Sequence, residues 1–393
     1  MGPPDPILGL TDAFNKDTDG RKVSLGVGAY RGDDGKPHVL NTVRKAEQLV
    51  LDKKMNHEYA GIHGVPDFIK LSLEFAYGQG AQALQDKRVA GVQTLSGTGA
   101  CRILGEFVNK FQGSGAPMYL PNPTWGNHIP IFGNAGLEVR KYRYYKPDTC
   151  GLDFEGLLED ISQAPSGSTF LLHACAHNPT GVDPSAAQWS QISQLMMDKG
   201  HTVFFDCAYQ GFASGDAEKD AGAIRQFVDD GHCIALGQSF AKNFGLYGER
   251  IGALSVVCKD EEEAARVESQ LKILIRPMYS NPPVYGARLV SEILSDAALR
   301  TEWSEECRMM ADRIMSMRTA LRASLEGCGS TRNWEHITDQ IGMFCYTGLT
   351  KDEVLKVREE NRIYFTADGR ISMAGLTTSN VDYVGQSIFA AVG

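Results

Sequence analysis

The chain has 393 residues, with 48 acidic and 39 basic side chains and a formal net charge of −9. This excess of acid argues against a nucleic acid as the main partner, because such affinity comes chiefly from Lys and Arg that neutralise phosphates. The hydrophobic fraction of 42% is enough for a large core, and the length is typical of two or three units at roughly 150 residues per domain. A mostly disordered chain is therefore excluded.

The nine cysteines stand singly, and no two of them form a Cys-x-x-Cys pair. This pattern is typical of small buried residues in a reducing compartment and not of a disulfide framework. No apolar run approaches the roughly 18 residues of a membrane span, and residues 1–5 lack the basic and apolar regions of a signal peptide. We therefore expect a cytoplasmic protein without a membrane partner, although a mature organellar protein that has lost its transit peptide would have the same features.

Short β-branched or aromatic runs alternate with longer amphipathic stretches through the middle of the chain, which is typical of βα units and a parallel sheet. One such unit contains a helix for which we expect Asp183 as the N-cap and Pro184 at the first helical position. The expected strands, in chain order, are residues 92–95, 117–120, 168–175, 202–205, 233–239 and 251–258.

Beyond Trp303 the pattern changes to a long helix whose apolar side chains recur at spacings of four and three. This apolar stripe indicates packing at a domain interface; it consists of Trp303, Cys307, Met310, Ile314, Met317 and Leu321. We expect an N-terminal arm and the first part of a small domain over residues 1–37. A large domain over 38–309 and the rest of the small domain over 310–393 would follow.

A turn of small residues, Gly97-Thr98-Gly99, lies between the expected strand 92–95 and a helix. Unpaired N–H groups and the helix dipole at such a turn favour a phosphate, and the hydroxyl of Ser96 would add a donor. The same residues also fit a purely structural turn. The Gly-x-Gly-x-x-Gly spacing of a dinucleotide fold is not met, and no Gly-x-x-x-x-Gly-Lys-Ser/Thr loop is present.

Polar residues follow three later strands, 168–175, 202–205 and 233–239, at the sheet edge where ligands gather in open α/β folds. Asn178 would donate to an oxyanion from its amide, and Asp206 needs a cation or donors to offset its desolvation. Lys242 follows an apolar strand, where desolvation lowers the pKa of the amine and makes it a nucleophile. Arg250 offers a planar fork for phosphate. Taken alone, each of these residues would also be typical of a structural turn, a helix cap or a solvated surface position.

Together and in this order, the motifs resemble those of the class I aminotransferases that use pyridoxal phosphate, most closely the aspartate aminotransferase branch. The similarity covers nearly the whole chain, from residues 23–31 (VSLGVGAYR) to 369–371 and 375–378. It is most specific in residues 239–247 (SFAKNFGLY) and 280–283 (SNPP). The resemblance implies the α/β fold-type I architecture of pyridoxal-phosphate-dependent transferases. Its large domain has a mainly parallel sheet with helices on both faces, and both chain ends build a smaller α+β domain.

The resemblance also implies a cofactor site for pyridoxal 5′-phosphate. Lys242 would hold the cofactor as a covalent aldimine and move a proton, while Asp206 would pair with the ring nitrogen and Trp125 would stack on the ring. Asn178 and Tyr209 would bond the phenolate oxygen. The residues expected around the phosphate are Ser96, Gly97, Thr98, Ser239, Arg250 and, from a neighbouring subunit, Tyr59. His128 is expected to support Asp206.

Substrate recognition follows from two arginines in the same resemblance. Arg370 would bind the α-carboxylate in a bidentate pair, and Arg276 of the neighbouring subunit would bind a distal carboxylate. The other expected substrate contacts are Gly28, Trp125, Asn178 and Phe344. We therefore expect a homodimer with shared active sites that carries out reversible ping-pong transamination. Its reaction would convert L-aspartate and 2-oxoglutarate into oxaloacetate and L-glutamate.

Three alternatives compete with this expectation. An aromatic amino acid aminotransferase of the same family would share both arginines. A nicotinamide-dependent dehydrogenase needs an acidic residue at the end of the next strand, where Pro121 and Asn122 stand instead. A scaffold protein without activity is disfavoured by the joint presence of Lys242, Asp206, Tyr209, Arg250 and Arg370.

Two local features bear on the expected chemistry. Ala241 stands where many relatives have a second serine for the phosphate, so one hydroxyl contact is missing. His173 and His177 lie four apart on a strand and turn, a spacing that does not converge on one ion, so we expect no metal site.

Overall fold

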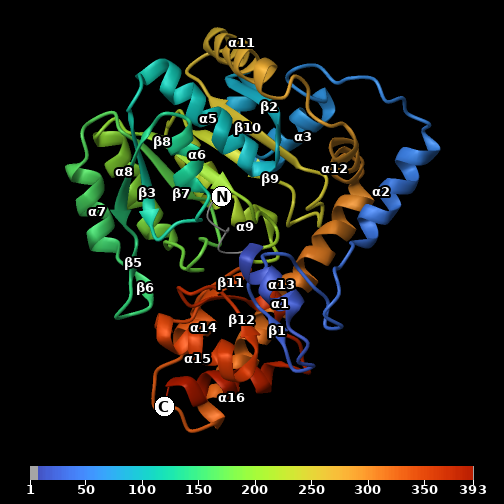
Figure 1. The fold of residues 1–393 in the computed structure, drawn as a ribbon. Coiled ribbons are helices and arrows are strands. Elements are labelled where there is room, and N and C mark those ends of the chain that lie inside the picture. Colours follow the sequence, from blue (N-terminus) through green and yellow to red (C-terminus); the bar gives the residue numbers. More distant parts are fainter. Residues whose placement is uncertain (1–7, 393) are drawn as a thin grey trace.

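The computed structural model describes residues 8–392, and a seven-stranded sheet runs through the upper part of the molecule in Figure 1. The strand order is β2-β10-β9-β8-β7-β3-β4, and all strands are parallel except β10. The strands are β2 (Val89–Leu95), β3 (Pro117–Asn122), β4 (Glu138–Arg143), β7 (Thr169–His173), β8 (Thr202–Cys207), β9 (Ala235–Ser239) and β10 (Ile251–Val257). All six strands expected from the sequence are therefore present, with ends that differ by a few residues.

Helices cover both faces of this sheet. In β7, Phe170 packs in one hydrophobic cluster with Trp189 of α8 (Ala186–Asp198). The next residue, Leu171, packs in another cluster with Leu104 of α5 (Ser96–Gln112). Because successive side chains of a strand point to opposite faces, a strand covered on both sides must be apolar throughout, and β7 is buried along its whole length.

The remaining elements of this part surround the sheet. They are α2 (Asn41–Asp52), α3 (Pro66–Tyr77), α4 (Gln82–Gln85), α6 (His128–Asn134), β5 (Tyr145–Lys146), β6 (Gly151–Leu152), α7 (Phe154–Gln163), α9 (Ala217–Asp220), α10 (Gly222–Asp229), α11 (Glu261–Met278) and α12 (Tyr285–Ser295).

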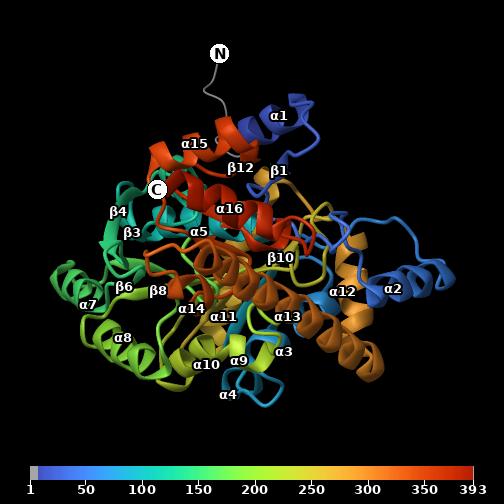
Figure 2. The ribbon, with the colours of Figure 1, turned by 90° about the horizontal axis from the view of Figure 1, so that it is seen from below.

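Both ends of the described chain meet in the smaller part of the molecule, at the bottom of Figure 1. There β1 (Val23–Ser24) pairs in parallel with β12 (Ile363–Tyr364), and α1 (Leu8–Lys16) lies beside them (Figure 2). The strands β11 (Phe344–Tyr346) and β13 (Arg370–Ser372) form an antiparallel pair. The other elements are α14 (Glu335–Asp339), α15 (Lys351–Asn361), η1 (Met373–Gly375) and α16 (Val381–Val392).

A single long helix, α13 (Ala297–Gly327), connects the two parts. Its apolar stripe is buried as expected; Trp303 stacks on Phe244 with ring centroids 4.8 Å apart. The helix begins earlier than predicted because the Asp296 side chain caps the N–H groups of Ala298 and Leu299. The proposed domain boundary between residues 309 and 310 falls inside this helix and stays a prediction. Within residues 8–392, no helix has the length and apolar character needed to cross a membrane.

The predicted cap of α8 is wrong. Ser185, not Asp183, is the N-cap, and it forms a reciprocal capping box with Gln188. The Asp183 carboxylate instead accepts hydrogen bonds from the N–H groups of Ala176 and His177, at 2.6 and 2.9 Å. A buried carboxylate needs donors, and the turn after β7 provides two.

Candidate active site

A cavity of about 320 Å³ lies at the carboxyl ends of the parallel strands. All the residues expected at the cofactor and substrate line it, except Tyr59 and Arg276. The complete lining is Gly28, Ser96, Gly97, Thr98, Trp125, Asn127, His173, Cys175, Asn178, Asp206, Ala208, Tyr209, Ser239, Lys242, Arg250, Phe344 and Arg370. The topology thus brings together motifs that are far apart in the sequence.

The amine of Lys242 lies in this cavity close to charged and aromatic groups. Its Nζ is 5.7 Å from the ring centroid of Tyr209. Burial lowers the pKa of Lys242; the Asp206 carboxylate opposes this effect and the Arg250 guanidinium adds to it. A lowered pKa increases the neutral fraction of the amine near pH 7, which is the form that attacks a carbonyl or accepts a proton.

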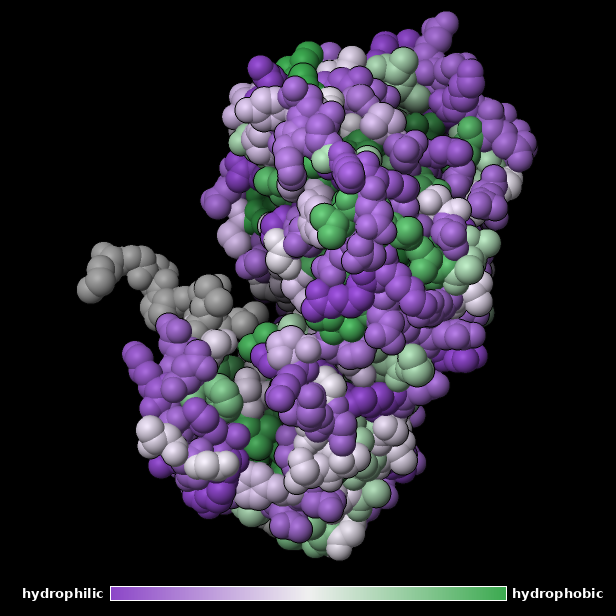
Figure 3. Space-filling view, turned by 90° about the vertical axis from the view of Figure 1, so that its right-hand side faces the viewer, coloured by the Kyte–Doolittle hydropathy of each residue, from purple (hydrophilic) through white to green (hydrophobic). Residues whose placement is uncertain are grey.

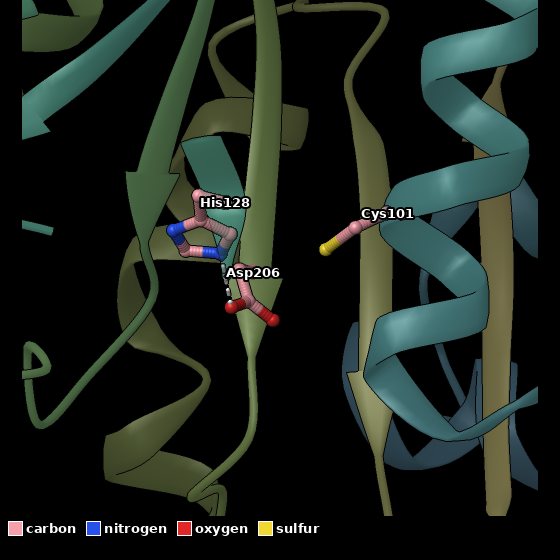
Figure 4. A group of neighbouring side chains, drawn as sticks. All are labelled: Cys101, His128 and Asp206. Atoms are coloured by element: carbon pink, nitrogen blue, oxygen red, sulfur yellow. Dashed lines mark hydrogen bonds and ion pairs between the residues drawn. The ribbon is translucent and has the colours of Figure 1, made fainter. Parts of the chain in front are cut away.

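The carboxylate of Asp206 is held by His128 of α6 (Figure 4). His128 Nε2 lies 3.1 Å from Asp206 Oδ2, and the other ring nitrogen lies 2.8 Å from the Thr124 hydroxyl. Burial alone would raise the pKa of Asp206, but the His128 hydrogen bond and the nearby positive groups together lower it. Asp206 therefore stays ionised and can pair with a protonated ring nitrogen.

His173 extends this network, and sequence reasoning missed it. Its Nε2 lies 3.4 Å from the Thr124 hydroxyl, and its Nδ1 accepts from the N–H of Asn178 at 3.3 Å. Burial, with the neighbouring His128, lowers the pKa of His173 to about 3, so the ring is neutral. Sequence reasoning treated His173 only as a potential metal ligand. The available signal was register, because His173 of β7 lies beside Asp206 of β8.

Cys101 of α5 points toward the same pair from the other side (Figure 4), and the potential ligand atoms of Cys101, His128 and Asp206 lie within 4.8 Å of one another. Both ring nitrogens of His128 are already engaged in hydrogen bonds. Burial and the Asp206 charge raise the pKa of the Cys101 thiol, which keeps its proton. We therefore describe the group as a hydrogen-bonded pair beside a neutral thiol.

One end of the cavity has the character of a phosphate site. Ser96, with φ of 60°, makes the sharp turn from β2 into α5, and its hydroxyl lies 3.0 Å from that of Ser239. The N–H groups of the first turn of α5 face an anion favourably at this position. The Arg250 guanidinium donates to the Tyr247 carbonyl at 2.9 Å and also lines the cavity. This set of donors fits a phosphate group, with no hydroxyl at Ala241.

The opposite side of the cavity presents a buried arginine. Arg370 is only 5% exposed, and its guanidinium lies 4.1 Å from the ring centroid of Phe344. It donates to the Gly26 carbonyl at 3.1 Å and to Asn178 Oδ1 at 3.4 Å. Among residues 8–392, no carboxylate lies within 4 Å of its guanidinium nitrogens. A buried cation that keeps free donors toward a cavity fits the carboxylate of a ligand.

The aromatic residues and Gly28 shape the space between these two ends. Burial raises the pKa of Tyr209, so its phenol stays a hydrogen-bond donor. Trp125 meets His128 edge to face, with centroids 5.1 Å apart. A Cβ on Gly28 would lie 2.8 Å from Phe344 Cζ, so a larger residue here would have to displace the aromatic ring.

Two expected residues lie outside the cavity. Tyr59 is 84% exposed, and Arg276 is exposed near the end of α11, where it donates to the Ser280 hydroxyl at 2.6 Å. These are the two residues that the resemblance assigns to a neighbouring subunit. A single chain therefore builds the cavity without them.

Comparisons with known proteins identify the family. A family model described as aminotransferase class I and II matches residues 20–388. The mitochondrial aspartate aminotransferase of Dictyostelium discoideum is 57% identical over 389 residues, covering 99% of this chain and 91% of that protein.

Solved structures agree with this match. The cytoplasmic aspartate aminotransferase of Saccharomyces cerevisiae has a TM-score of 0.97 at 44% identity, covering 100% of this chain and 97% of that one. An aromatic amino acid aminotransferase of Burkholderia pseudomallei, covalently bound to pyridoxal phosphate, has a TM-score of 0.97 at 41% identity, covering 100% and 98%. The chain belongs to the class I and II aminotransferase family.

Proposed function

We propose that the protein is a pyridoxal-phosphate-dependent transaminase that interconverts L-aspartate and 2-oxoglutarate with oxaloacetate and L-glutamate by a ping-pong scheme. The observation that carries the proposal is the cavity itself. It sets a lysine of lowered pKa beside an ionised aspartate, and it places a buried arginine without a carboxylate partner at the far side. The identity to an aspartate aminotransferase supports the substrate.

The residues around the cavity fit pyridoxal 5′-phosphate. When bound, the cofactor supplies an electrophilic carbonyl carbon and an electron-withdrawing ring. Lys242 would hold it covalently, and Asp206 would keep its ring nitrogen protonated, with Trp125 against the ring. Asn178 and Tyr209 would donate to its phenolate oxygen. The phosphate would bind to Ser96, Gly97, Thr98, Ser239 and Arg250.

Lys242 would also transfer the proton of the reaction. Its Nζ would take the proton from the α-carbon of the amino acid and return one at the cofactor side, as a general base and then an acid. This role requires an amine that is neutral near working pH, and burial lowers the pKa in that direction. Asp206 and Tyr209 would keep their respective charged and protonated states throughout.

Arg370 would orient the substrate through its α-carboxylate. The guanidinium rests on the Phe344 ring, and Phe344 in turn lies against Gly28, so both groups are fixed before the substrate binds. This preorganisation reduces the entropy lost on binding.

We infer a homodimer in which Tyr59 and Arg276 reach into the partner's cavity. The support is that Tyr59 is 84% exposed and that exposed Leu51, Met55 and Tyr285 lie on α2, the segment after it and α12. That side of the molecule has hydrophobic residues scattered among hydrophilic ones (Figure 3). Arg276 would then select dicarboxylic substrates. A preference of the protein for aromatic amino acids would indicate that Arg276 does not have this role.

We further propose that the protein works in a reducing compartment. All nine cysteines are free, which suits the cytoplasm or an organelle interior. The Dictyostelium discoideum relative is mitochondrial and the yeast structure is cytoplasmic, and both of these compartments are reducing.

The visible spectrum of the purified protein tests the cofactor and the reaction together. We expect an absorption band from covalently bound cofactor that shifts when L-aspartate is added and returns with 2-oxoglutarate. Lys242→Ala should lose the covalent band and the transaminase activity. A protein without such a band, or a band that L-aspartate leaves unchanged, would refute the proposal.

A further inference from the structure

Two cysteines, Cys233 and Cys258, stand just beyond the end of the β9–β10 ladder that is farthest from the cavity. The antiparallel register continues one residue past the end of β9, because the N–H of Val257, the last residue of β10, donates to the Ile234 carbonyl at 2.8 Å. The next position of that register brings Cys258 opposite Cys233. Hydrogen-bonded and non-hydrogen-bonded pairs alternate in such a ladder, so these cysteines form a non-hydrogen-bonded pair, in which side chains lie closest.

This position meets the geometric requirement of a disulfide. Residues of a non-hydrogen-bonded pair have Cα atoms roughly 4.5 Å apart, within the range of about 4.4–6.8 Å that disulfides span. Directly opposed residues also point to the same face of the sheet. On that face Cys258 packs against Ala90 and against Ala264 of α11.

The two thiols differ in exposure. Cys233 is exposed, whereas Cys258 is buried. Burial raises the pKa of Cys258 to about 11, and burial with the nearby Glu263 raises that of Cys233. Both groups therefore remain thiols near neutral pH, and the pair stays reduced until an oxidant is present. An oxidant in solution meets Cys233 first.

We propose that Cys233 and Cys258 form a reversible disulfide when the protein meets an oxidised low-molecular-weight thiol such as oxidised glutathione. The Cys233 thiolate attacks one sulfur of the oxidant, breaks its S–S bond and releases one thiol. The Cys258 thiolate then attacks the Cys233 sulfur and releases the second thiol. The two cysteines lose two protons and two electrons, and the oxidant becomes two thiols.

The bond would close a loop over residues 233–258, which contains Ser239, Lys242 and Arg250. Cys233 stands six residues before Ser239 along an extended strand, or roughly 20 Å at about 3.3 Å per residue. The cross-link would therefore restrain the segment that carries the cofactor lysine while leaving the cavity unchanged. Such a restraint acts mainly on the unfolded chain.

Peptide mapping tests the pairing. We would incubate the holoenzyme with oxidised glutathione, block the remaining thiols with an alkylating agent, and identify linked peptides by mass spectrometry. A Cys233–Cys258 peptide is expected in the wild type and in the control Cys328→Ser, but not in Cys233→Ser. In Cys258→Ser, glutathione should remain attached to Cys233. Absence of the linked peptide, a persistent glutathione adduct in the wild type, or linkage to another cysteine would overturn the proposal.

Thermal unfolding and activity test the consequence. The oxidised wild type should unfold at a midpoint higher by roughly 2–5 °C, a shift that dithiothreitol reverses and that Cys233→Ser lacks. Its transaminase activity should stay within about twofold of the reduced form. An unchanged midpoint, or a loss of activity that parallels formation of the linked peptide, would contradict a remote cross-link on this segment.

Discussion

Gly252 of β10 permits the close approach between that strand and the turn that carries Ser96. A Cβ at this position would lie 2.5 Å from the Ser96 carbonyl carbon and 2.6 Å from the Gln238 carbonyl oxygen. Both neighbours are backbone atoms, which cannot rotate away as a side chain would. The glycine thus fixes the position of Ser96, whose hydroxyl is expected to bind the phosphate. The sequence gives no local signal of this requirement.

We expect Gly252→Ala to weaken both the fold and cofactor binding. Overpacking of this kind costs roughly 1–3 kcal/mol of stability, and the displaced Ser96 turn should raise the dissociation constant of pyridoxal phosphate. Cofactor titration by fluorescence and thermal unfolding would measure both effects. Gly248→Ala is the matched control, because its Cβ would meet nothing within 4 Å; equal behaviour of the two variants would contradict the argument.

His173 is predicted to make stability depend on pH. Its pKa is lowered from 6.5 to about 3 in the folded protein, first by burial and then by His128. Below pH 6.5 the unfolded chain therefore binds a proton that the folded protein does not. This linkage costs up to about 1.4 kcal/mol per pH unit, and stability falls as the pH drops from 6.5 toward 3.

The measurement compares wild type with His173→Asn between pH 7 and pH 5. The unfolding midpoint of the wild type should fall more steeply with decreasing pH, although the variant is less stable at pH 7 because it loses the contact with Thr124. Parallel curves would show that His173 does not titrate in the expected way. Groups remote from this site titrate equally in both proteins, so the difference between the curves reports on His173 and on its interaction with His128 and Asp206.

At the scale of elements, α13 holds the segment that carries Phe344. Arg318 of this helix is 1% exposed and donates to three carbonyls, those of Ile337, Gly342 and Phe344, at 2.9, 2.9 and 2.6 Å. The same segment is tied to the turn after β7, where the Ile341 N–H donates to the Gly181 carbonyl at 2.7 Å. The positions of the Phe344 ring and of Arg370 beside it thus depend on an arginine that binds the backbone of this segment.

Arg318→Met should raise KM for amino and keto acids by roughly tenfold, while the absorption band of the bound cofactor stays unchanged. The reason is that each buried carbonyl left without a donor costs about 1–3 kcal/mol, and the segment would relax away from Arg370. Steady-state kinetics with both substrate classes would measure the effect. The control Arg322→Met removes a more exposed arginine one turn later, which contacts Thr338 and Glu326. A loss confined to kcat would contradict a positioning role.

The elements that the sequence predicted well are those with a local signal. β7 contains a short apolar run and α13 has a regular apolar stripe, so composition and periodicity were sufficient to find them. The pairs β1–β12 and β11–β13 were not predicted, because strands of two or three residues carry no periodicity and pair with partners distant in the chain. The prediction that Asp183 caps α8 was wrong for a similar reason. Its donors, Ala176 and His177, become its neighbours only when the turn folds.

At the scale of the whole molecule, the order of the strands explains why most of the candidate site could be predicted. Asn178, Asp206 and Ser239 follow or end neighbouring strands β7, β8 and β9, so a parallel sheet brings them to one edge. Arg370 comes from the small part of the molecule, and its presence in the site was predicted only from family resemblance. Tyr59 and Arg276 lie outside the cavity of their own chain. Their expected role in the site therefore depends on a neighbouring subunit.

Hybrid dimers test whether Arg276 acts across the interface. Lys242→Ala subunits keep Arg276, and Arg276→Ala subunits keep Lys242, so a mixed dimer has one site with both groups only if Arg276 is supplied by the partner. Each pure variant should have little aspartate activity. Random exchange makes half of the dimers hybrids with one complete site each, so the mixture should recover about a quarter of wild-type activity.

The aromatic substrate distinguishes this result from simple refolding of the mixture. Arg276→Ala alone should lose far more activity toward aspartate than toward an aromatic amino acid, because only the dicarboxylate places a second negative charge near Arg276. Mixing should therefore restore aspartate turnover in particular. If the mixture is no more active toward aspartate than the sum of its parts, while subunit exchange is verified by mass, Arg276 acts within its own chain or not at all.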